Sequence, residues 1–346
     1  MKLSLRTSAV AQSLFAITIG LIIGAFLMIV FGYDPIKAYF ALFIGAFGSV
    51  SDFLETLAFA VPLMLTGLTF AIGVRAGLFN IGSEGQIYVG ALGSVVVGGL
   101  LNLPFGLGIV FATLAGAFAS VLWSLTPALL KVTRGVHEVI STIMLNWIAF
   151  WFTTYLIVYH FGDPNRAERS IAVLPNSRYP ILFEGSTLTT ALVVAIAYCV
   201  LVYFILWGTK VGYELRVEGT NPDAGRYAGV KAWKTTLLAF SLGGIASGLA
   251  GASQIIGRPP AWALYATLGN VAGLGFDGLG VALIGRNHPI GVIISSIFFG
   301  ALIQGSRSMQ YNAGVYFEIV RAITGIIIIA LSVPEAITII RRWIKK

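Results

Sequence analysis

Long apolar runs recur along almost the whole chain, separated by short segments that hold most of its polar residues. A run of about twenty apolar residues is the length that an α-helix needs to cross the hydrocarbon core of a bilayer. The composition agrees, because only 10% of the residues are charged, whereas soluble domains have about 25%. The runs do not alternate between apolar and polar residues, which argues against an outer-membrane barrel. The sequence therefore predicts an all-α integral membrane protein.

The basic residues fall mainly at the ends of these runs, which predicts about ten transmembrane helices with both termini in the cytoplasm. The positive-inside bias also explains the net charge of +8 without nucleic-acid binding. The first run is too long for a signal peptide and lacks a cleavage site, so we interpret it as a retained span. We expect spans at about residues 9–31, 54–74, 87–101, 105–130, 137–160, 187–207, 235–256 and 271–284, then one ending near residue 304 and one near residue 341.

Residues 75–86, called the connecting stretch below, join two apolar runs and contain Gly77, Gly82 and Gly85. Each glycine costs about 1 kcal/mol relative to alanine in a helix, so the sequence predicts a break here. One interpretation is a broken segment that lines a substrate path, as in many transporters. The other is a polar cytoplasmic turn in which Glu84 is a helix-start carboxylate. The candidate path residues are Asn80, Ser83, Glu84 and Gln86.

Asn146 lies about two turns inside the span at 137–160 and is a further candidate path residue. A buried amide in a bilayer needs a partner, which is either another helix or a ligand. His137 begins the same span. We interpret it as an interfacial hydrogen-bonding residue, and the alternative is a role in proton handling or ligand binding.

Residues 76–82 and 272–278 have similar sequences, and the two segments follow spans that run in opposite directions. This similarity predicts an inverted repeat of spans 2–5 and 7–10, with broken helices near the centre and Asp277 in the path. The alternative is chance similarity between glycine-rich segments. Residues 273–278 also have dinucleotide-loop spacing, but no predicted strand precedes them, so we discount that motif. Gly244 and Gly248 predict a close helix contact.

The largest inner loop, residues 208–234, contains a short helix, an Asn221-Pro222 turn and a second short helix in its predicted structure. Such a polar unit either docks on a cytoplasmic partner or is a solvated connection. No phosphate-binding loop, zinc-ligand spacing or nucleophile elbow occurs, and Cys199 is the single cysteine. We therefore expect no enzymatic site, no cofactor and no metal.

Taken together, several motifs in order resemble the permeases of bacterial ABC importers for simple sugars and branched-chain amino acids. The resemblance is closest to the nucleoside importers that work with a lipoprotein of the basic membrane protein type. It covers nearly the whole chain. The motifs are Gly77–Gln86, His137–Asn146, Asn221–Gly229, Gly275–Gly278 and Gly285–Pro289.

This resemblance implies a single permease domain over residues 1–346 in the cytoplasmic membrane, importing nucleosides by alternating access. The implied partners are a second homologous permease, cytoplasmic ATP-binding subunits and an external substrate-binding lipoprotein. Residues 208–234, the coupling segment, would contact the ATPase. Many relatives have Arg-Ala-Val-Gly where this chain has Arg216-Val-Glu-Gly219, which leaves the exact contact open. The implied coupling residues are Arg216, Glu218, Gly219, Asn221, Pro222, Arg226 and Tyr227.

Two alternatives remain open. The same class of importer would carry a simple sugar with few changes in its path. A self-contained secondary transporter or channel would use an ionisable residue at mid-membrane, for which Glu84 and Asp277 are the candidates.

Overall fold

The computed structural model describes residues 9–104 and 106–344, most of them in helices. The chain divides into two compact units, one formed by Met1–Thr56 with Phe298–Lys346 and the other by Leu57–Ile297. The helical class of the protein is as predicted. The single permease domain over residues 1–346 stays a prediction.

The first unit contains helices from both ends of the chain. Within it α1 (Ala9–Val30) packs against α13 (Phe317–Ile344), with Gly20 and Gly24 of α1 in contact with isoleucines of α13. Helix α2 (Pro35–Phe47) begins at Asp34, whose side chain accepts hydrogen bonds from two backbone N–H groups of the first turn. The start of α3 (Val50–Arg75) and most of α12 (Pro289–Ala313) complete this unit.

The second unit is built around α4 (Ser83–Leu100), α5 (Leu107–Arg134) and α10 (Ala232–Ile255), which pack closely on one another. The close contact predicted for Gly248 is confirmed, since a Cβ there would lie 2.6 Å from the Cα of Ala117. Its other helices are the rest of α3, α6 (Glu138–Tyr159), α7 (Ala191–Gly208), α8 (Lys210–Thr220), α9 (Pro222–Tyr227) and α11 (Leu274–Ile284).

The expected spans fall on α1, α3, α4, α5, α6, α7, α10, α11, α12 and α13. Among the residues that the structure describes, 6 of these helices are long and apolar enough to cross a membrane: α3, α5, α6, α7, α10 and α12. Helix α11 has 11 residues and is therefore about 16 Å long, which is shorter than the core of a bilayer. A multi-pass membrane protein is confirmed, and the count of about ten spans stays a prediction.

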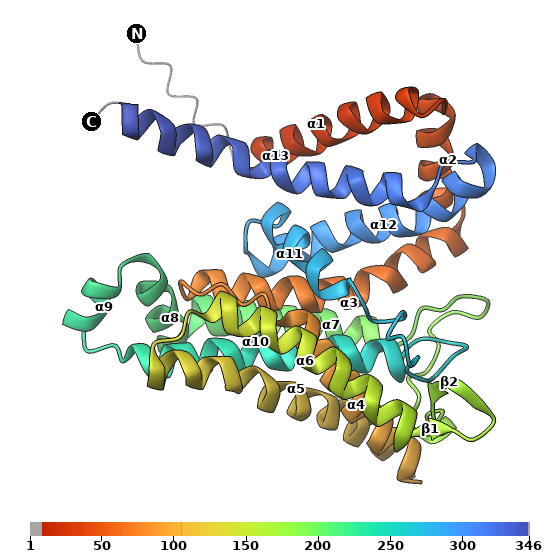
Figure 1. The fold of residues 1–346 in the computed structure, drawn as a ribbon, viewed down its shortest axis with the longest axis horizontal. Helices are drawn as coiled ribbons and strands as arrows, with labels where there is room; N and C mark the ends of the chain where they lie inside the picture. The colour runs from red at the N-terminus through yellow and green to blue at the C-terminus, as the bar shows by residue number, and fades with distance from the viewer. Residues whose placement is uncertain (1–8, 105, 345–346) are drawn as a thin grey trace. The chain divides into compact units, whose positions relative to one another are not determined.

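Within the second unit, helices α8 and α9 lie at one end and a small hairpin lies at the other (Figure 1). The hairpin, β1 (Gly162–Asp163) with β2 (Arg166–Ser170), is a departure from the purely helical expectation. Its ends are held by an ion pair between Arg169 and Asp163 at 2.8 Å. The backbone N–H of Asn165 and the Arg169 guanidinium hold the pKa of Asp163 below its usual value.

The segment 261–270, expected to re-enter the membrane or lie in its interface, hydrogen-bonds to strand β2 and to the chain just after it. The N–H of Ser170 donates to the carbonyl of Leu264 and that of Val173 to the carbonyl of Trp262, each at 2.8 Å. Backbone groups that belong to no helix are thereby paired within the protein, as burial requires.

Candidate functional site

The predicted break in the connecting stretch is confirmed. Helix α3 ends at Arg75, α4 begins at Ser83, and the residues between them are not helical. Gly77 has a φ of +72°, a conformation that glycine adopts without the steric cost that other residues bear. Arg75 fixes the end of α3, because its Nε donates to the carbonyl of Asn287 at 2.8 Å.

Two amide side chains of this stretch are buried against each other. The Oδ1 of Asn80 accepts from the N–H of Gly82 at 3.0 Å and from Nε2 of Gln86 at 3.2 Å. Asn80 Nδ2 and Gln86 Oε1 are buried without a hydrogen-bond partner in the part of the chain that the structure describes. Each retains an unused hydrogen-bonding position, at a cost in stability.

Ser83 connects the start of α4 to α3 and α10. Its hydroxyl lies 2.9 Å from the hydroxyl of Ser247, which lies 2.9 Å from the hydroxyl of Thr69. The three hydroxyls form a buried chain, and sequence reasoning named only Ser83 among them. Ser and Thr are ordinary residues at helix contacts in membranes, so spacing alone did not identify the other two.

Glu84 connects the start of α4 to the start of α11. Its carboxylate accepts hydrogen bonds from the backbone N–H groups of Gly273 and Gly275 and from the hydroxyl of Tyr88. The positive ends of two helix dipoles therefore meet at one carboxylate. Gly273 and Gly275 belong to the second of the two similar segments, and Glu84 lies two residues after the first; the inverted repeat stays a prediction. Asp277 is in the first turn of α11 and is half-buried.

Asn146 of α6 finds its partners in the backbone around the break. Its Oδ1 accepts from the N–H of Gly85 at 2.8 Å, and its Nδ2 donates to the carbonyl of Ile81 at 3.0 Å. The expectation that this buried amide needs a partner is thereby met by protein groups. Both ends of the side chain are used, so Asn146 also fixes α6 against α4.

A cavity of about 170 Å³, the aromatic cavity below, lies where α4, α6 and α11 meet. Glu84 and Asn146, both predicted path residues, line it. The aromatic residues were not predicted, although Tyr88 is one helical turn after Glu84 and Trp147 is adjacent to Asn146. Aromatic residues are common in membrane spans because they pack well, so their positions near Glu84 and Asn146 did not indicate a cavity. The full lining is Glu84, Tyr88, Ile143, Asn146, Trp147, Phe150 and Phe276.

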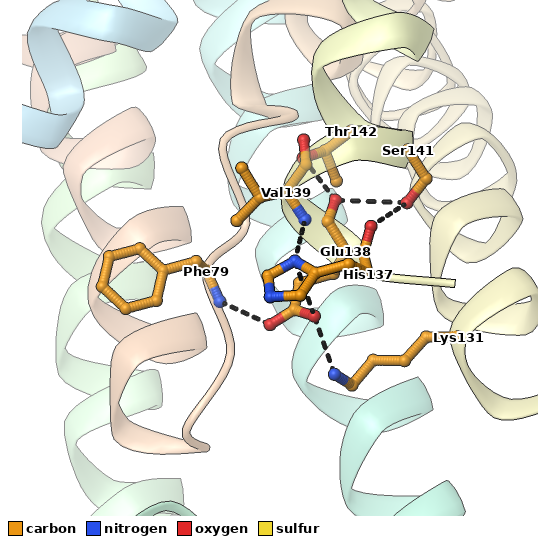
Figure 2. A network of polar contacts seen from close by, with 7 residues as sticks. All are labelled: Phe79, Lys131, His137, Glu138, Val139, Ser141 and Thr142. Atoms are coloured by element: carbon orange, nitrogen blue, oxygen red, sulfur yellow. Dashed lines mark hydrogen bonds and ion pairs between the residues drawn. The ribbon is translucent and has the colours of Figure 1, made fainter. Parts of the chain in front are cut away.

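A second polar network connects the start of α6 to the connecting stretch (Figure 2). Glu138 accepts the backbone N–H of Phe79 at 3.3 Å and forms an ion pair with Lys131 at 2.7 Å. His137 precedes it, and its Nδ1 accepts the N–H of Val139 at 3.3 Å. This cap agrees with the interpretation of His137 as a hydrogen-bonding residue at a helix end.

The coupling segment has the predicted helix, turn and helix. Asn221 accepts the N–H of Ala224 at 3.1 Å and Pro222 occupies the first turn of α9, so this dipeptide ends α8 and begins α9. Arg226 is exposed, and Tyr227 has 93% of its surface exposed. They belong to an exposed run that covers residues 220–224 and 226–229.

Of the other predicted coupling residues, Asn221 and Pro222 are exposed, whereas three at the end of α8 are partly buried. Gly219 lies against the turn after α3, since a Cβ on Gly77 would be 2.9 Å from the Cα of Gly219. Arg216 and Glu218 are half-buried. The coupling segment therefore presents an exposed face on α9 and a second face, at the end of α8, that touches the connecting stretch.

Within residues 9–104 and 106–344, no group of 3 or more His, Cys, Asp or Glu side chains is placed to hold a metal ion. The site is built instead from amides, hydroxyls, one carboxylate and aromatic rings. Stacking surfaces together with neutral hydrogen-bonding groups are the chemistry that suits a neutral polar solute.

The chain is similar to characterised permeases over most of its length. The chain is 36% identical over 344 residues to the guanosine ABC transporter permease protein NupP of Bacillus subtilis, covering 99% of this chain and 98% of the relative. It is 34% identical to the nucleoside ABC transporter permease protein NupB of Lactococcus lactis, covering 96% and 93%. It is 30% identical to the glucose ABC transporter permease protein TsgB13 of Haloferax volcanii, covering 91% and 85%.

No solved structure matches the chain. The sequence profile of one permease family matches residues 52–332, which include every helix that contributes to the site. The protein is thus a transport component of the membrane and not an enzyme. By this match, the chain belongs to the family of permease components of branched-chain amino acid transport systems.

Proposed function

We propose that the chain is the permease subunit of an ATP-driven importer that carries nucleosides across the cytoplasmic membrane. The observation that carries the choice of substrate is the aromatic cavity, whose rings lie beside a carboxylate and an amide. A nucleobase has a flat π-face, and stacking on an aromatic side chain contributes about 1–3 kcal/mol per base. The relatives named for guanosine and nucleosides support the same choice.

A simple sugar is the second candidate, because the glucose permease relative is also similar over most of its length. Sugars stack less extensively than bases and need more hydrogen-bonding groups for their hydroxyls. The polar groups of the lining are the Tyr88 hydroxyl, the Trp147 indole N–H, and Glu84 and Asn146. Glu84 and Asn146 already bond to protein. The cavity therefore favours the substrate with the larger flat face.

Replacing Trp147 by alanine is expected to reduce nucleoside uptake about tenfold, because about 1.4 kcal/mol of stacking is lost. The measurement is uptake of labelled guanosine and uridine, with glucose as the competitor, in cells lacking other nucleoside importers. Trp151→Ala is the matched control, since Trp151 is on the same helix and outside the cavity lining. Equal losses in the two variants, or glucose displacing the nucleosides, would refute this substrate assignment.

We also propose the partners and the path of coupling. The exposed face of α9 would dock on a cytoplasmic ATP-binding subunit, and a second homologous permease would complete the path. An external lipoprotein would deliver the substrate. Closure of the ATPases would push α8, whose Gly219 touches Gly77, and so move the connecting stretch. That stretch bonds to α6 and α11 through Asn146 and Glu84.

In this mechanism the starts of α4 and α11, which meet at Glu84, separate or rotate when the site switches between opening outward and opening inward. Asn80, Ser83 and Gln86 are buried in this structure. We propose that they face the substrate in another state of the cycle, where the unused amide atoms of Asn80 and Gln86 would find a partner. Asp277, at the start of α11, would belong to the same path.

The proposed orientation puts both termini and the coupling segment in the cytoplasm. A cysteine at the exposed Thr220, with Cys199 replaced by alanine, should react with an impermeant maleimide only in inside-out vesicles. The matched control is a cysteine at Asn165, in the exposed turn of the hairpin at the other end of the unit (Figure 1). Labelling of Thr220→Cys in intact cells would overturn the orientation.

A further inference from the structure

A second cavity, of about 300 Å³, lies between the end of α3, the end of α8 and the turn that joins α11 to α12. We call it the arginine cavity because Arg75, Arg216 and Arg286 line it. Its lining, within the described part of the chain, includes no acidic side chain. The like charges of Arg75 and Arg216 beside one cavity repel each other, and this repulsion falls when an anion enters.

Arg216 and Arg75 are held on the same aromatic ring. Their guanidinium carbons lie 5.6 Å and 5.5 Å from the ring centroid of Trp207, within the range of a cation–π contact. The Nε of Arg216 is buried and has no hydrogen-bond partner among residues 9–104 and 106–344. A buried donor without a partner is costly, and a bound acceptor would remove that cost.

The turn on the other side of the cavity is held in an unusual conformation. Arg286 and Asn287 have φ angles of 56° and 51°, which non-glycine residues seldom adopt. Arg75 fixes this turn, because it donates to the carbonyls of both residues. Asn287 Oδ1 is buried without a partner in the described structure, so it offers an acceptor for a hydroxyl of a ligand.

We propose that the arginine cavity binds a phosphate-bearing anion. Guanidinium groups match the geometry and charge of phosphate oxygens, and the Asn287 acceptor suits a protonated phosphate oxygen or an ester's hydroxyl. This anion is either a soluble phosphate or the headgroup of a phospholipid. The soluble form is inorganic phosphate or a small phosphate ester.

An acidic side chain of the ATPase is the alternative occupant. Asp223, Arg226 and Tyr227 on α9 are exposed, and so is Thr220, which lines the cavity at the end of α8. The buried Nε of Arg216 and the buried Oδ1 of Asn287 lack partners in the described structure, and they favour a ligand small enough to reach both inside the cavity.

The position of the cavity gives the anion a consequence for transport. Gly219 both lines the cavity and touches Gly77 in the connecting stretch. An anion shared by Arg216 on α8 and Arg286 after α11 would hold α8 against the end of α3. This consequence rests on the proposed coupling function, but the binding of the anion does not.

The test uses the full-length chain purified in a non-ionic detergent. We expect inorganic phosphate or glycerol 3-phosphate to raise the unfolding midpoint saturably, by about 2 °C or more, above sodium chloride of equal ionic strength. If the anion is instead a phospholipid headgroup, we expect phosphatidylglycerol to remain bound after purification and to be detected by native mass spectrometry. Response to the soluble probes or retention of the lipid identifies the source, and either result supports the proposal.

Arg216→Gln should abolish the response, and Arg226→Gln, an exposed arginine outside the cavity, should keep it. If Arg216→Gln does not fold, Arg286→Gln replaces it. No response and no bound lipid, or a response that survives these substitutions, would overturn the proposal. If these substitutions weaken only the association with the ATPase and leave the anion response unchanged, the arginines belong to a protein interface and the proposal is overturned. Nucleoside uptake is not a readout, so failure of this proposal is distinguishable from failure of the proposed function.

Discussion

Replacing Gly219 by alanine is expected to abolish ATP-driven uptake while the protein stays in the membrane. A Cβ at this position would lie 2.7 Å from the backbone N of Gly77 and 2.9 Å from the carbonyl carbon of Ala76. Backbone atoms cannot move aside as a side chain can, so α8 must shift away from the connecting stretch. Overpacking of this kind costs about 1–3 kcal/mol, and here it separates the two segments through which ATPase motion would pass.

The measurement is nucleoside uptake together with nucleoside-stimulated ATP hydrolysis in reconstituted vesicles. Gly225→Ala is the matched control, because Gly225 is in the same segment and the one close neighbour of its added Cβ among the described residues would be the flexible Glu218 carboxylate at 3.1 Å, the next atoms being at ordinary contact distances of 3.6 Å and 3.8 Å. We expect the control to transport normally. Normal coupled uptake by Gly219→Ala would contradict the proposed route, and loss of the protein from the membrane would show a folding role instead.

The elements that local chemistry determines were predicted from the sequence. Glycines together with polar residues predicted the break after Arg75, and the Asn221-Pro222 dipeptide predicted the turn between α8 and α9. Both features depend on backbone conformations that specific residues favour or prevent. The family resemblance predicted the class of transporter, which the comparisons confirm.

The contacts between distant segments were not predictable in this way. Gly77 was noted as a helix-breaking glycine and Gly219 as a coupling residue implied by the resemblance, and nothing in either motif indicated that their backbones touch. Trp147 and Phe276 were missed because an aromatic residue that lines a cavity has the same local pattern as one that faces lipid. The roles assigned to Asn80, Ser83, Gln86 and Asp277 stay predictions.

Glu84→Ala is expected to destabilise the protein and to reduce uptake as a result. The substitution removes the acceptor for two backbone N–H groups at the start of α11 and for the Tyr88 hydroxyl. Hydrogen bonds inside membranes average about 0.6 kcal/mol, so three of them amount to roughly 2 kcal/mol. N–H groups left without an acceptor raise the loss further. Helix α11 then loses its fixed position against α4.

Detergent unfolding and uptake, measured on the same variants, separate this structural role from a role in binding substrate. Tyr88→Phe is the matched control, because it removes one of the three hydrogen bonds and keeps both backbone partners; we expect its stability to stay near wild type. Glu84→Gln should lie between the two, since an amide keeps one acceptor oxygen and presents a donor where the second was. A Glu84→Ala protein of wild-type stability that fails to transport would show that the carboxylate acts on the substrate. In that case Glu84 contributes to transport by contacting the substrate and not by joining the starts of α4 and α11.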